Sequence, residues 1–154
     1  MSVYLVRHAK AGSRRKWDGA DDQRPLSDPG RAQAEALGAW LADEGVVRVE
    51  SSPFVRCRQT VEPLAARLKL PVDLADALAE GAPTPEALRL IEKFGDEHVV
   101  LCTHGDVVSN VLWDAQQRGI KLDHDRMEKA GTWVLTLDAG LVSGARYVPP
   151  PSMP

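Results

Sequence analysis

The chain of 154 residues is poor in cysteine, with only Cys57 and Cys102. Two cysteines can build neither a disulfide framework nor a four-cysteine metal site. Because both lie in apolar patterns, we expect them to be small buried residues. The four histidines show no compact ligand spacing, so we expect no metal site.

Long apolar runs and an excess of positive charge are also absent. The opening apolar run, residues 3–6, is interrupted by Arg7 and is too short for a secretory signal, and no segment is long enough to span a membrane. The net charge of -3 argues against a general nucleic-acid binder. We therefore expect a cytoplasmic protein without a membrane or nucleic-acid partner. A small anion needs only a local positive patch, so an anionic ligand stays open.

What the chain does contain is an alternation of apolar strands and amphipathic helices. Residues 3–6 and 98–102 are apolar without alternation, as in strands buried on both faces of a parallel sheet. The pattern adds strands over 46–50 and 71–76, helices over 27–45, 51–70, 84–94 and 105–119, and an antiparallel pair over 132–148.

This order of elements predicts an α/β fold. It is a three-layer α/β/α sandwich with a mostly parallel central sheet and an antiparallel C-terminal edge. We expect one domain over residues 1–148 and a Pro-rich tail over 149–154. Ser27 is a suitable N-cap for the first helix, and Ser52 followed by Pro53 for the second.

Charged residues follow several of the expected strand ends. Arg7 and His8 follow the first strand, and the other candidates behind later strands are Arg56, Glu80 and His104. The carboxyl ends of parallel strands meet at one edge of a sheet, so these side chains should gather there.

Such a set suits phosphoryl transfer. Arginine offers a planar fork of donors to phosphate oxygens, and a helix that begins at Gly105 would add free backbone N–H groups. A neutral imidazole can attack phosphorus, and a carboxylic acid can protonate the leaving oxygen.

Four motifs carry a family resemblance: "VRHAKAG", "LSDPGRAQA", "SSPFVRCRQTV" and "CTHGDVV", in this order. The sequence resembles the histidine phosphatase (phosphoglycerate mutase-like) superfamily. It is most similar to the short SixA-type phosphohistidine phosphatases and to the phosphatase domain fused to some Nudix hydrolases.

The resemblance implies a metal-independent phosphatase, without a cofactor, that works through a covalent phospho-His8 intermediate. It implies that Arg7, Arg56, His104 and Gly105 bind the phosphate and that Glu80 is the proton donor. Asp76 and Glu86 are rivals for that last role. The implied partner is a phosphorylated small molecule, including a nucleotide, or a phosphohistidine protein.

Two alternatives to a phosphatase stay open. One is a weakly active or inactive module that binds phosphate or a phosphoprotein. The other is a phosphomutase, although the chain lacks the larger insertions of sugar-phosphate mutases.

Two features of the first loop raise separate questions. Ala9 stands where the family usually has glycine, and alanine cannot adopt glycine-only backbone angles.

The basic run that follows supplies candidates for substrate specificity, which are Lys10, Ser13, Arg15 and Trp17. Trp17 either stacks on a nucleotide base or packs against the protein. Asp21 is among the acidic residues that can pair with the basic run.

Overall fold

One six-stranded sheet organises the chain, in the strand order β3-β2-β4-β1-β5-β6. The computed structural model describes residues 2–152. The strands are β1 (Ser2–Arg7), β2 (Arg48–Ser51), β3 (Val72–Leu74), β4 (Val99–Thr103), β5 (Thr132–Asp138) and β6 (Leu141–Val148). β1 to β4 run parallel, whereas β5 and β6 form an antiparallel hairpin at one edge.

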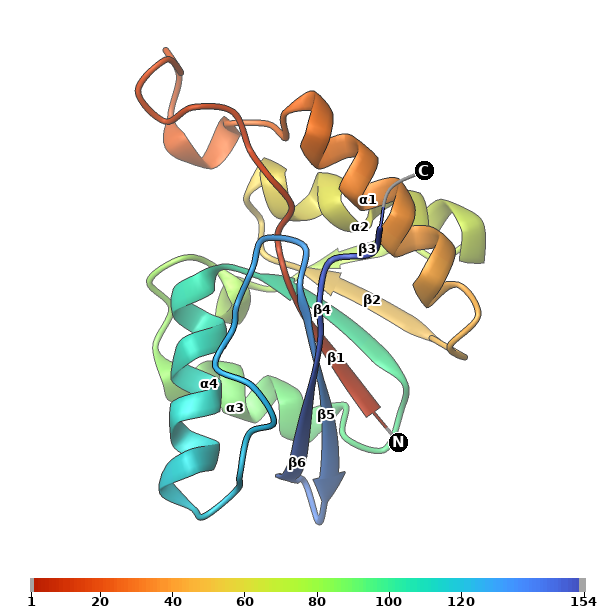
Figure 1. The fold of residues 1–154 in the computed structure, drawn as a ribbon, viewed down its shortest axis with the longest axis vertical. Helices are drawn as coiled ribbons and strands as arrows, with labels where there is room; N and C mark the ends of the chain where they lie inside the picture. Colours follow the sequence, from red (N-terminus) through yellow and green to blue (C-terminus); the bar gives the residue numbers. More distant parts are fainter. Residues whose placement is uncertain (1, 153–154) are drawn as a thin grey trace.

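Helices cover both faces of this sheet (Figure 1). α1 (Asp28–Leu41) and α2 (Val55–Leu68) pack together on one face. α3 (Thr84–Lys93) and α4 (Gly105–Gln117) lie on the other. Two short 3-10 turns, η1 (Asp21–Gln23) and η2 (Asp76–Leu78), complete the order of elements. This architecture confirms the predicted three-layer fold with its antiparallel edge.

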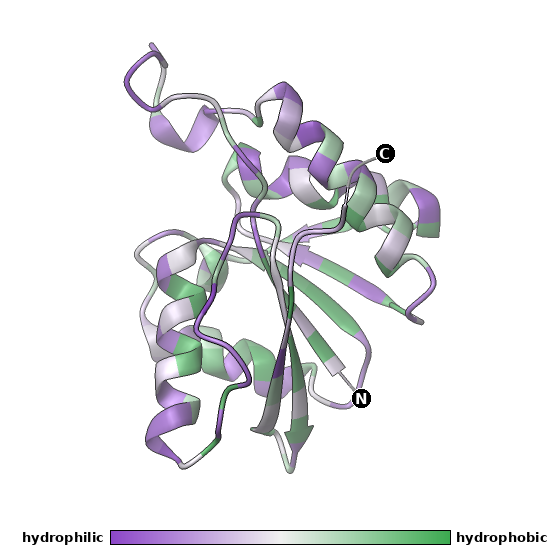
Figure 2. Cartoon of the chain, in the orientation of Figure 1, coloured by the Kyte–Doolittle hydropathy of each residue, from purple (hydrophilic) through white to green (hydrophobic). Residues whose placement is uncertain are grey.

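Alternating side chains of the central strands build a separate core on each face. Val3 and Leu5 of β1 join the core under α3 and α4. Tyr4 and Val6 join the core under α1 and α2. Figure 2 shows the central strands as largely hydrophobic and the protruding loop before α1 as largely hydrophilic. The continuous apolar run therefore reflects burial on both sides, as parallel strands require.

The structure confirms the predicted N-cap at Ser27 but not the one at Ser52. The Ser27 side chain accepts a hydrogen bond from the Gly30 N–H at 3.2 Å, as an N-cap does. The second helix begins only at Val55, without a side-chain cap. Ser52 instead accepts from the Phe54 N–H and contacts His104, so its hydroxyl serves the site rather than the helix.

The C-terminal segment continues from β6 without a helix or strand over residues 149–152. Residues 153–154 of the expected tail lie outside the described residues, and the division into one domain and a tail stays a prediction. Over residues 2–152, the helices are all too short or too polar to cross a bilayer. The cytoplasmic location likewise stays a prediction.

Gly30 allows the first turn of α1 to touch the backbone of the loop that follows β1. A Cβ at this position would lie 1.8 Å from the carbonyl oxygen of Lys10, which also accepts the Ser27 N–H. We expect Gly30→Ala to lower the free energy of unfolding by about 1–3 kcal/mol, because backbone atoms must move to make room.

Urea denaturation would measure this loss. Gly12→Ala is the matched control, since a Cβ there meets nothing nearer than the Pro25 carbonyl oxygen at 4.0 Å. We expect the control to change stability by less than about 0.5 kcal/mol. A Gly30→Ala protein as stable as the control would contradict the close contact.

Candidate functional site

Strand register brings the two motif histidines together. Arg7 of β1 is paired with Thr103 of β4 in a parallel ladder. The next residue on each strand is a histidine, so His8 and His104 leave the same edge of the sheet side by side. Their ring centroids are 5.4 Å apart and their planes are inclined by 68°.

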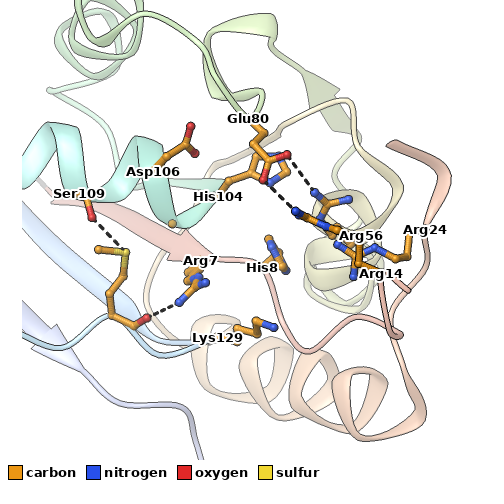
Figure 3. Close-up of a pocket in the computed structure, with 12 residues that line it drawn as sticks. Arg7, His8, Arg14, Arg24, Arg56, Glu80, His104, Asp106, Ser109 and Lys129 are labelled. Carbon is orange, nitrogen blue, oxygen red and sulfur yellow. Dashed lines mark hydrogen bonds and ion pairs between the residues drawn. The ribbon is translucent and has the colours of Figure 1, made fainter. Parts of the chain in front are cut away.

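A cavity of about 450 Å³ opens at this edge. All six residues predicted for catalysis and phosphate binding line it (Figure 3). The complete lining is Arg7, His8, Arg14, Arg24, Arg56, Glu80, His104, Gly105, Asp106, Ser109, Met127 and Lys129. In Figure 3, His8 lies between a group of arginines and the pair Arg7 and Lys129.

His8 is held as a neutral ring with one nitrogen free. Its Nδ1 lies 2.8 Å from the Ala9 carbonyl oxygen, which can only accept, so Nδ1 carries the proton. Burial lowers the pKa of His8 to about 3 against the favourable Ala9 contact, and the neighbouring His104 and Arg56 add to the lowering. Nε2 therefore keeps its lone pair for attack at neutral pH.

His104 is the N-cap residue of α4. It is buried, and its ring is held in place through Nε2. Its Nε2 lies 2.9 Å from the Ser52 hydroxyl and 3.5 Å from the Cys57 sulfur. The Ser52 oxygen accepts the Phe54 N–H, and the Ser52 hydroxyl can at the same time donate its proton to Nε2 of the matching His104 tautomer. The buried Nδ1 has no protein partner and is then the nitrogen that can donate to a ligand.

Arg7 lies against the N-terminus of α4. Its Nη1 donates to the Met127 carbonyl oxygen at 2.6 Å, while its buried Nε has no partner. A Cβ on Gly105 would come within 3.1 Å of the guanidinium, so the glycine makes room for Arg7. Two donor systems, the guanidinium and the free N–H groups of the helix start, thus converge on one place.

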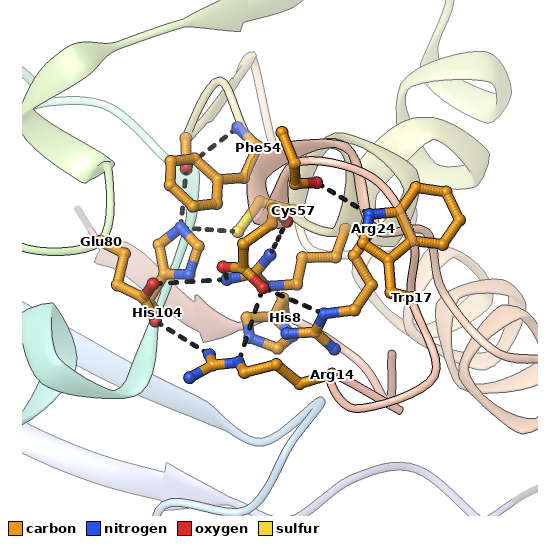
Figure 4. A network of polar contacts seen from close by, with 12 residues as sticks. His8, Arg14, Trp17, Arg24, Phe54, Cys57, Glu80 and His104 are labelled. Carbon is orange, nitrogen blue, oxygen red and sulfur yellow. Dashed lines mark hydrogen bonds and ion pairs between the residues drawn. The ribbon is translucent and has the colours of Figure 1, made fainter. Parts of the chain in front are cut away.

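Arg56 is fully buried in the first turn of α2 and is held by the segment before α1. Figure 4 shows the network of polar contacts at this end of the site, with Arg14, Arg24 and Glu80 among the labelled residues. Nη1 of Arg56 donates to the Asp21 backbone oxygen at 2.8 Å and its Nη2 to the Asp21 carboxylate at 3.1 Å. Although partial burial works against it, the hydrogen bond from Arg24 and the charge of Arg56 hold the pKa of Asp21 below its ordinary value. Asp21 also pairs with Arg14 at 3.5 Å, so one acidic residue of this loop pairs with the basic run.

Glu80 is the carboxylate that reaches the cavity from the turn after η2. Its oxygens lie 3.6 Å from Arg56 Nη2 and 3.8 Å from Arg14 Nη2. The neighbouring Gly81 N–H donates to Asp106 at 2.8 Å, which ties this turn to α4. The rivals considered from sequence, Asp76 and Glu86, are not among the residues that line the cavity.

Three further cations were not predicted as site residues: Arg14, Arg24 and Lys129. Arg14 and Arg24 come from a loop without periodicity, so nothing in the sequence distinguishes Arg14 from Arg15. Lys129 reaches the site because the neighbouring Ala130 N–H donates to the backbone oxygens of Arg7 and His8. Partial burial lowers the pKa of Lys129, and so does repulsion from the cations Arg7, Arg24, Lys10 and Arg56. The cavity therefore has a strongly positive field, suited to a phosphate.

The four specificity candidates of the first loop lie outside this cavity. Lys10 lines a neighbouring cavity, which shares Lys129 with the first. Ser13 and Arg15 are exposed. Trp17 donates from its indole N–H to the Ala20 carbonyl oxygen at 2.8 Å and lies against its own loop. Of the two interpretations of Trp17, the structure favours packing within the loop.

Ala9 does not disturb the site. It is fully buried, and its backbone is absent from the non-glycine residues with positive φ. Its N–H donates to the Thr60 hydroxyl at 2.9 Å, and its carbonyl oxygen holds His8. The position uses angles that alanine can adopt, so glycine is not needed there.

Chemically, the arrangement brings together an imidazole with one nitrogen free, converging donors and a carboxylate. Over residues 2–152, no group of three or more metal-ligating side chains is found. Cys57 and Cys102 are both buried and free, as predicted.

Comparisons with known proteins agree with this geometry. The family described as "Histidine phosphatase superfamily (branch 1)" matches residues 3–83, which hold three of the four motifs. The chain belongs to the histidine phosphatase superfamily. The match confirms the resemblance inferred from the motifs and places the chain in a superfamily of enzymes.

Three relatives illustrate the similarity. The chain is 37% identical over 156 residues to the 8-oxo-(d)GTP phosphatase of Mycolicibacterium smegmatis, covering 97% of this chain and 48% of that protein. It is 36% identical over 86 residues to the phosphohistidine phosphatase SixA of Escherichia coli, covering 54% of this chain and 50% of that protein. A SixA structure from Agrobacterium tumefaciens superposes with a TM-score of 0.70 at 25% identity, covering 88% of this chain and 90% of the other. The chain thus spans about half the length of the two curated relatives.

The lowered pKa of His8 leads to a titration that can be observed directly. An imidazole in an unfolded chain titrates near pH 6.5. We expect the ring of His8 to stay neutral, with the proton on Nδ1, from neutral pH down to about pH 5. Because the unfolded state takes up this proton first, His8 should also lower the stability as pH falls below about 6.5.

The ¹⁵N chemical shifts of the imidazole nitrogens, followed by NMR against pH, would test this. The signal that disappears in His8→Gln identifies the residue. Protonation of His8 between about pH 6 and 7, as for an exposed histidine, would contradict the assigned state.

Proposed function

We propose that this chain is a phosphatase that transfers a phosphoryl group first to His8 and then to water. The single observation that carries the proposal is the placement of the His8 ring. Its Nδ1 is tied to the Ala9 carbonyl oxygen, which leaves Nε2 free, and the ring lines a cavity together with several cations. The superfamily of the chain supports the same reaction class.

The proposed first step forms a bond from His8 Nε2 to phosphorus and breaks the bond from phosphorus to the leaving oxygen. Glu80 gives its proton to that oxygen, so the leaving group departs as a neutral hydroxyl compound. Arg7, Arg56, His104 and the N-terminus of α4 stabilise the charge on the transferring group.

In the proposed second step, the Glu80 carboxylate removes a proton from a water molecule that attacks the phosphorus. The bond from phosphorus to Nε2 breaks, and inorganic phosphate leaves. Positioned cations serve the purpose that a metal ion serves in other phosphoryl-transfer sites. We therefore expect activity to persist in the presence of a chelator.

The relatives suggest two substrate classes. One relative is named for a nucleotide and another for phosphohistidine. A nucleotide and a phosphohistidine each carry a phosphoryl group on an atom, oxygen or nitrogen, that Glu80 can protonate as it leaves. A phosphorylated small molecule and a phosphohistidine protein are therefore both within the proposal.

A binding module without turnover is the second candidate function. The observation that favours it is the ion pair between Glu80 and Arg56, with the Asp21 carboxylate bound to the same Nη2. A phosphate must compete with these carboxylates for the arginine. Tight phosphate binding without hydrolysis would support this binding module. Transfer of the phosphoryl group to a second substrate would instead support a phosphomutase.

We expect His8→Ala to abolish turnover of an aryl phosphate and to prevent formation of an acid-labile phosphoenzyme. The loss should exceed about 10³-fold, because the residue forms the covalent bond. His98→Ala is the control, since His98 directly precedes β4, at the opposite end of that strand from His104, and does not line the cavity. Wild-type turnover in His8→Ala would refute the proposed mechanism.

Glu80→Gln should slow the turnover of phosphate esters by a factor that depends on the leaving group. An alkyl phosphate needs protonation of the leaving oxygen, whereas a nitrophenyl phosphate needs much less. We expect a loss of about 10²-fold or more for the alkyl ester and a smaller loss for the nitrophenyl ester. Steady-state kinetics of both esters would measure the ratio.

Asp76→Asn and Glu86→Gln are the matched controls for this experiment, since neither carboxylate lines the cavity. An equal loss for both esters in Glu80→Gln would indicate a role in binding rather than as the acid. A larger loss in either control would assign the acid to that residue.

A further inference from the structure

A second cavity adjoins the phosphate cavity along α4. Its volume is about 290 Å³, at the lower end of small-molecule sites. It lies between α4 and the loop of residues 118–131 that leads to β5, two segments that run side by side in Figure 1. Ser109 and Met127 line both cavities, so together they form the boundary between the two.

The boundary is fixed on the phosphate side. The Met127 carbonyl oxygen accepts the hydrogen bond from Arg7, and its sulfur lies 3.8 Å from the Ser109 hydroxyl. In Figure 3, Ser109 lies farther along α4 than Asp106, on the side away from His8. A ligand that extends from the phosphate cavity past Ser109 therefore enters the second cavity.

The second cavity has the chemistry of an aromatic binding site. Trp113 lines it and is 63% exposed, the most exposed of the large apolar side chains. Leu112 and Leu122 add apolar wall, while Gln116 and Asp125 add hydrogen-bonding groups. An exposed indole beside apolar walls and a few polar groups is suited to stack on a flat ring and to bind its polar edge.

Helix geometry sets the distance between the two sites. Trp113 follows Gly105 by eight residues, so the rise of an α-helix places it about 12 Å farther along the axis. Ser109 is midway and one turn from each, on the same side of the helix. A ring that stacks on Trp113 must therefore be separated from the transferring phosphoryl group by a spacer, such as a pentose with or without a further phosphate.

We propose that the second cavity binds the base of a nucleotide whose terminal phosphoryl group lies at His8. This inference deepens the proposed function and rests on it for the placement of that phosphoryl group. The relative named as an 8-oxo-(d)GTP phosphatase is consistent with a nucleotide. A phosphohistidine fits the second cavity less well, because its ring is bonded directly to phosphorus and remains next to His8.

The test compares phosphorylated ligands with and without a base. Wild type and Trp113→Ala are assayed with guanosine 5′-monophosphate, guanosine 5′-diphosphate and ribose 5-phosphate. We expect kcat/KM for at least one nucleotide to fall about 10-fold in Trp113→Ala, with ribose 5-phosphate unchanged, as loss of one stacking contact predicts. Trp113→Phe keeps an aromatic face and should retain most of the activity, whereas Trp113→Leu should behave like Trp113→Ala.

Controls separate stacking from folding and from the other exposed indole. Leu141→Ala removes an exposed apolar side chain from the β5–β6 hairpin and should change none of the three values. Trp17→Ala tests the first loop as a rival base site. A base-dependent loss in Trp17→Ala with none in Trp113→Ala would overturn the proposal, and so would equal losses for nucleotide and ribose 5-phosphate.

Equilibrium binding distinguishes failure of this proposal from failure of the proposed function. Isothermal titration of His8→Ala with the same three ligands needs no turnover. If wild type releases no phosphate but the nucleotide binds about 10-fold more tightly than ribose 5-phosphate in a manner that requires Trp113, the base site stands and the phosphatase does not. If phosphate is released and the base adds neither affinity nor rate, or if a phosphohistidine peptide is the only substrate, the base site is refuted.

Discussion

The parallel pairing of β1 with β4 is the constraint on which the site depends. A register that pairs Arg7 with Thr103 makes His8 and His104 neighbours. A shift of one residue would turn one of these histidines to the opposite face of the sheet, since side chains alternate along a strand. The apolar residues on both faces of the two strands hold that register. The core thereby determines the distance between the two catalytic candidates.

A backbone carbonyl group directly orients His8, the proposed nucleophile. The Ala9 carbonyl oxygen selects the tautomer of His8, and burial keeps the ring neutral. Ala9 is held in turn by the Thr60 hydroxyl on α2. The orientation of the His8 ring is thus set by contacts within the protein itself.

The two sides of the cavity differ in how they are built. Arg7, His8, His104 and Gly105 stand on strand ends and a helix start, which are the rigid parts of the fold. Arg14 and Lys129 stand on loops. The first loop is tied to the site through Asp21, which accepts from Arg24 and Arg56, and the second through the Ala130 N–H. In α/β folds, residues that react with a substrate are commonly found at strand ends, and residues that recognise it are commonly found on loops.

The sequence by itself determined the layers, the parallel sheet and the motif residues. Strands buried on two faces appear in the sequence as continuous apolar runs, and the polar residues at the ends of these runs mark the motifs. It also placed Ser27 at the start of α1. Only the tertiary structure decided that Ser52 serves His104 rather than a helix cap, and that Arg14, Arg24 and Lys129 enter the cavity while Arg15 and Trp17 do not. These positions depend on hydrogen bonds between residues far apart in the chain, such as those from Arg56 to Asp21 and from Ala130 to Arg7. A loop has no periodicity from which such contacts can be read, so its side chains take their roles from the fold around it.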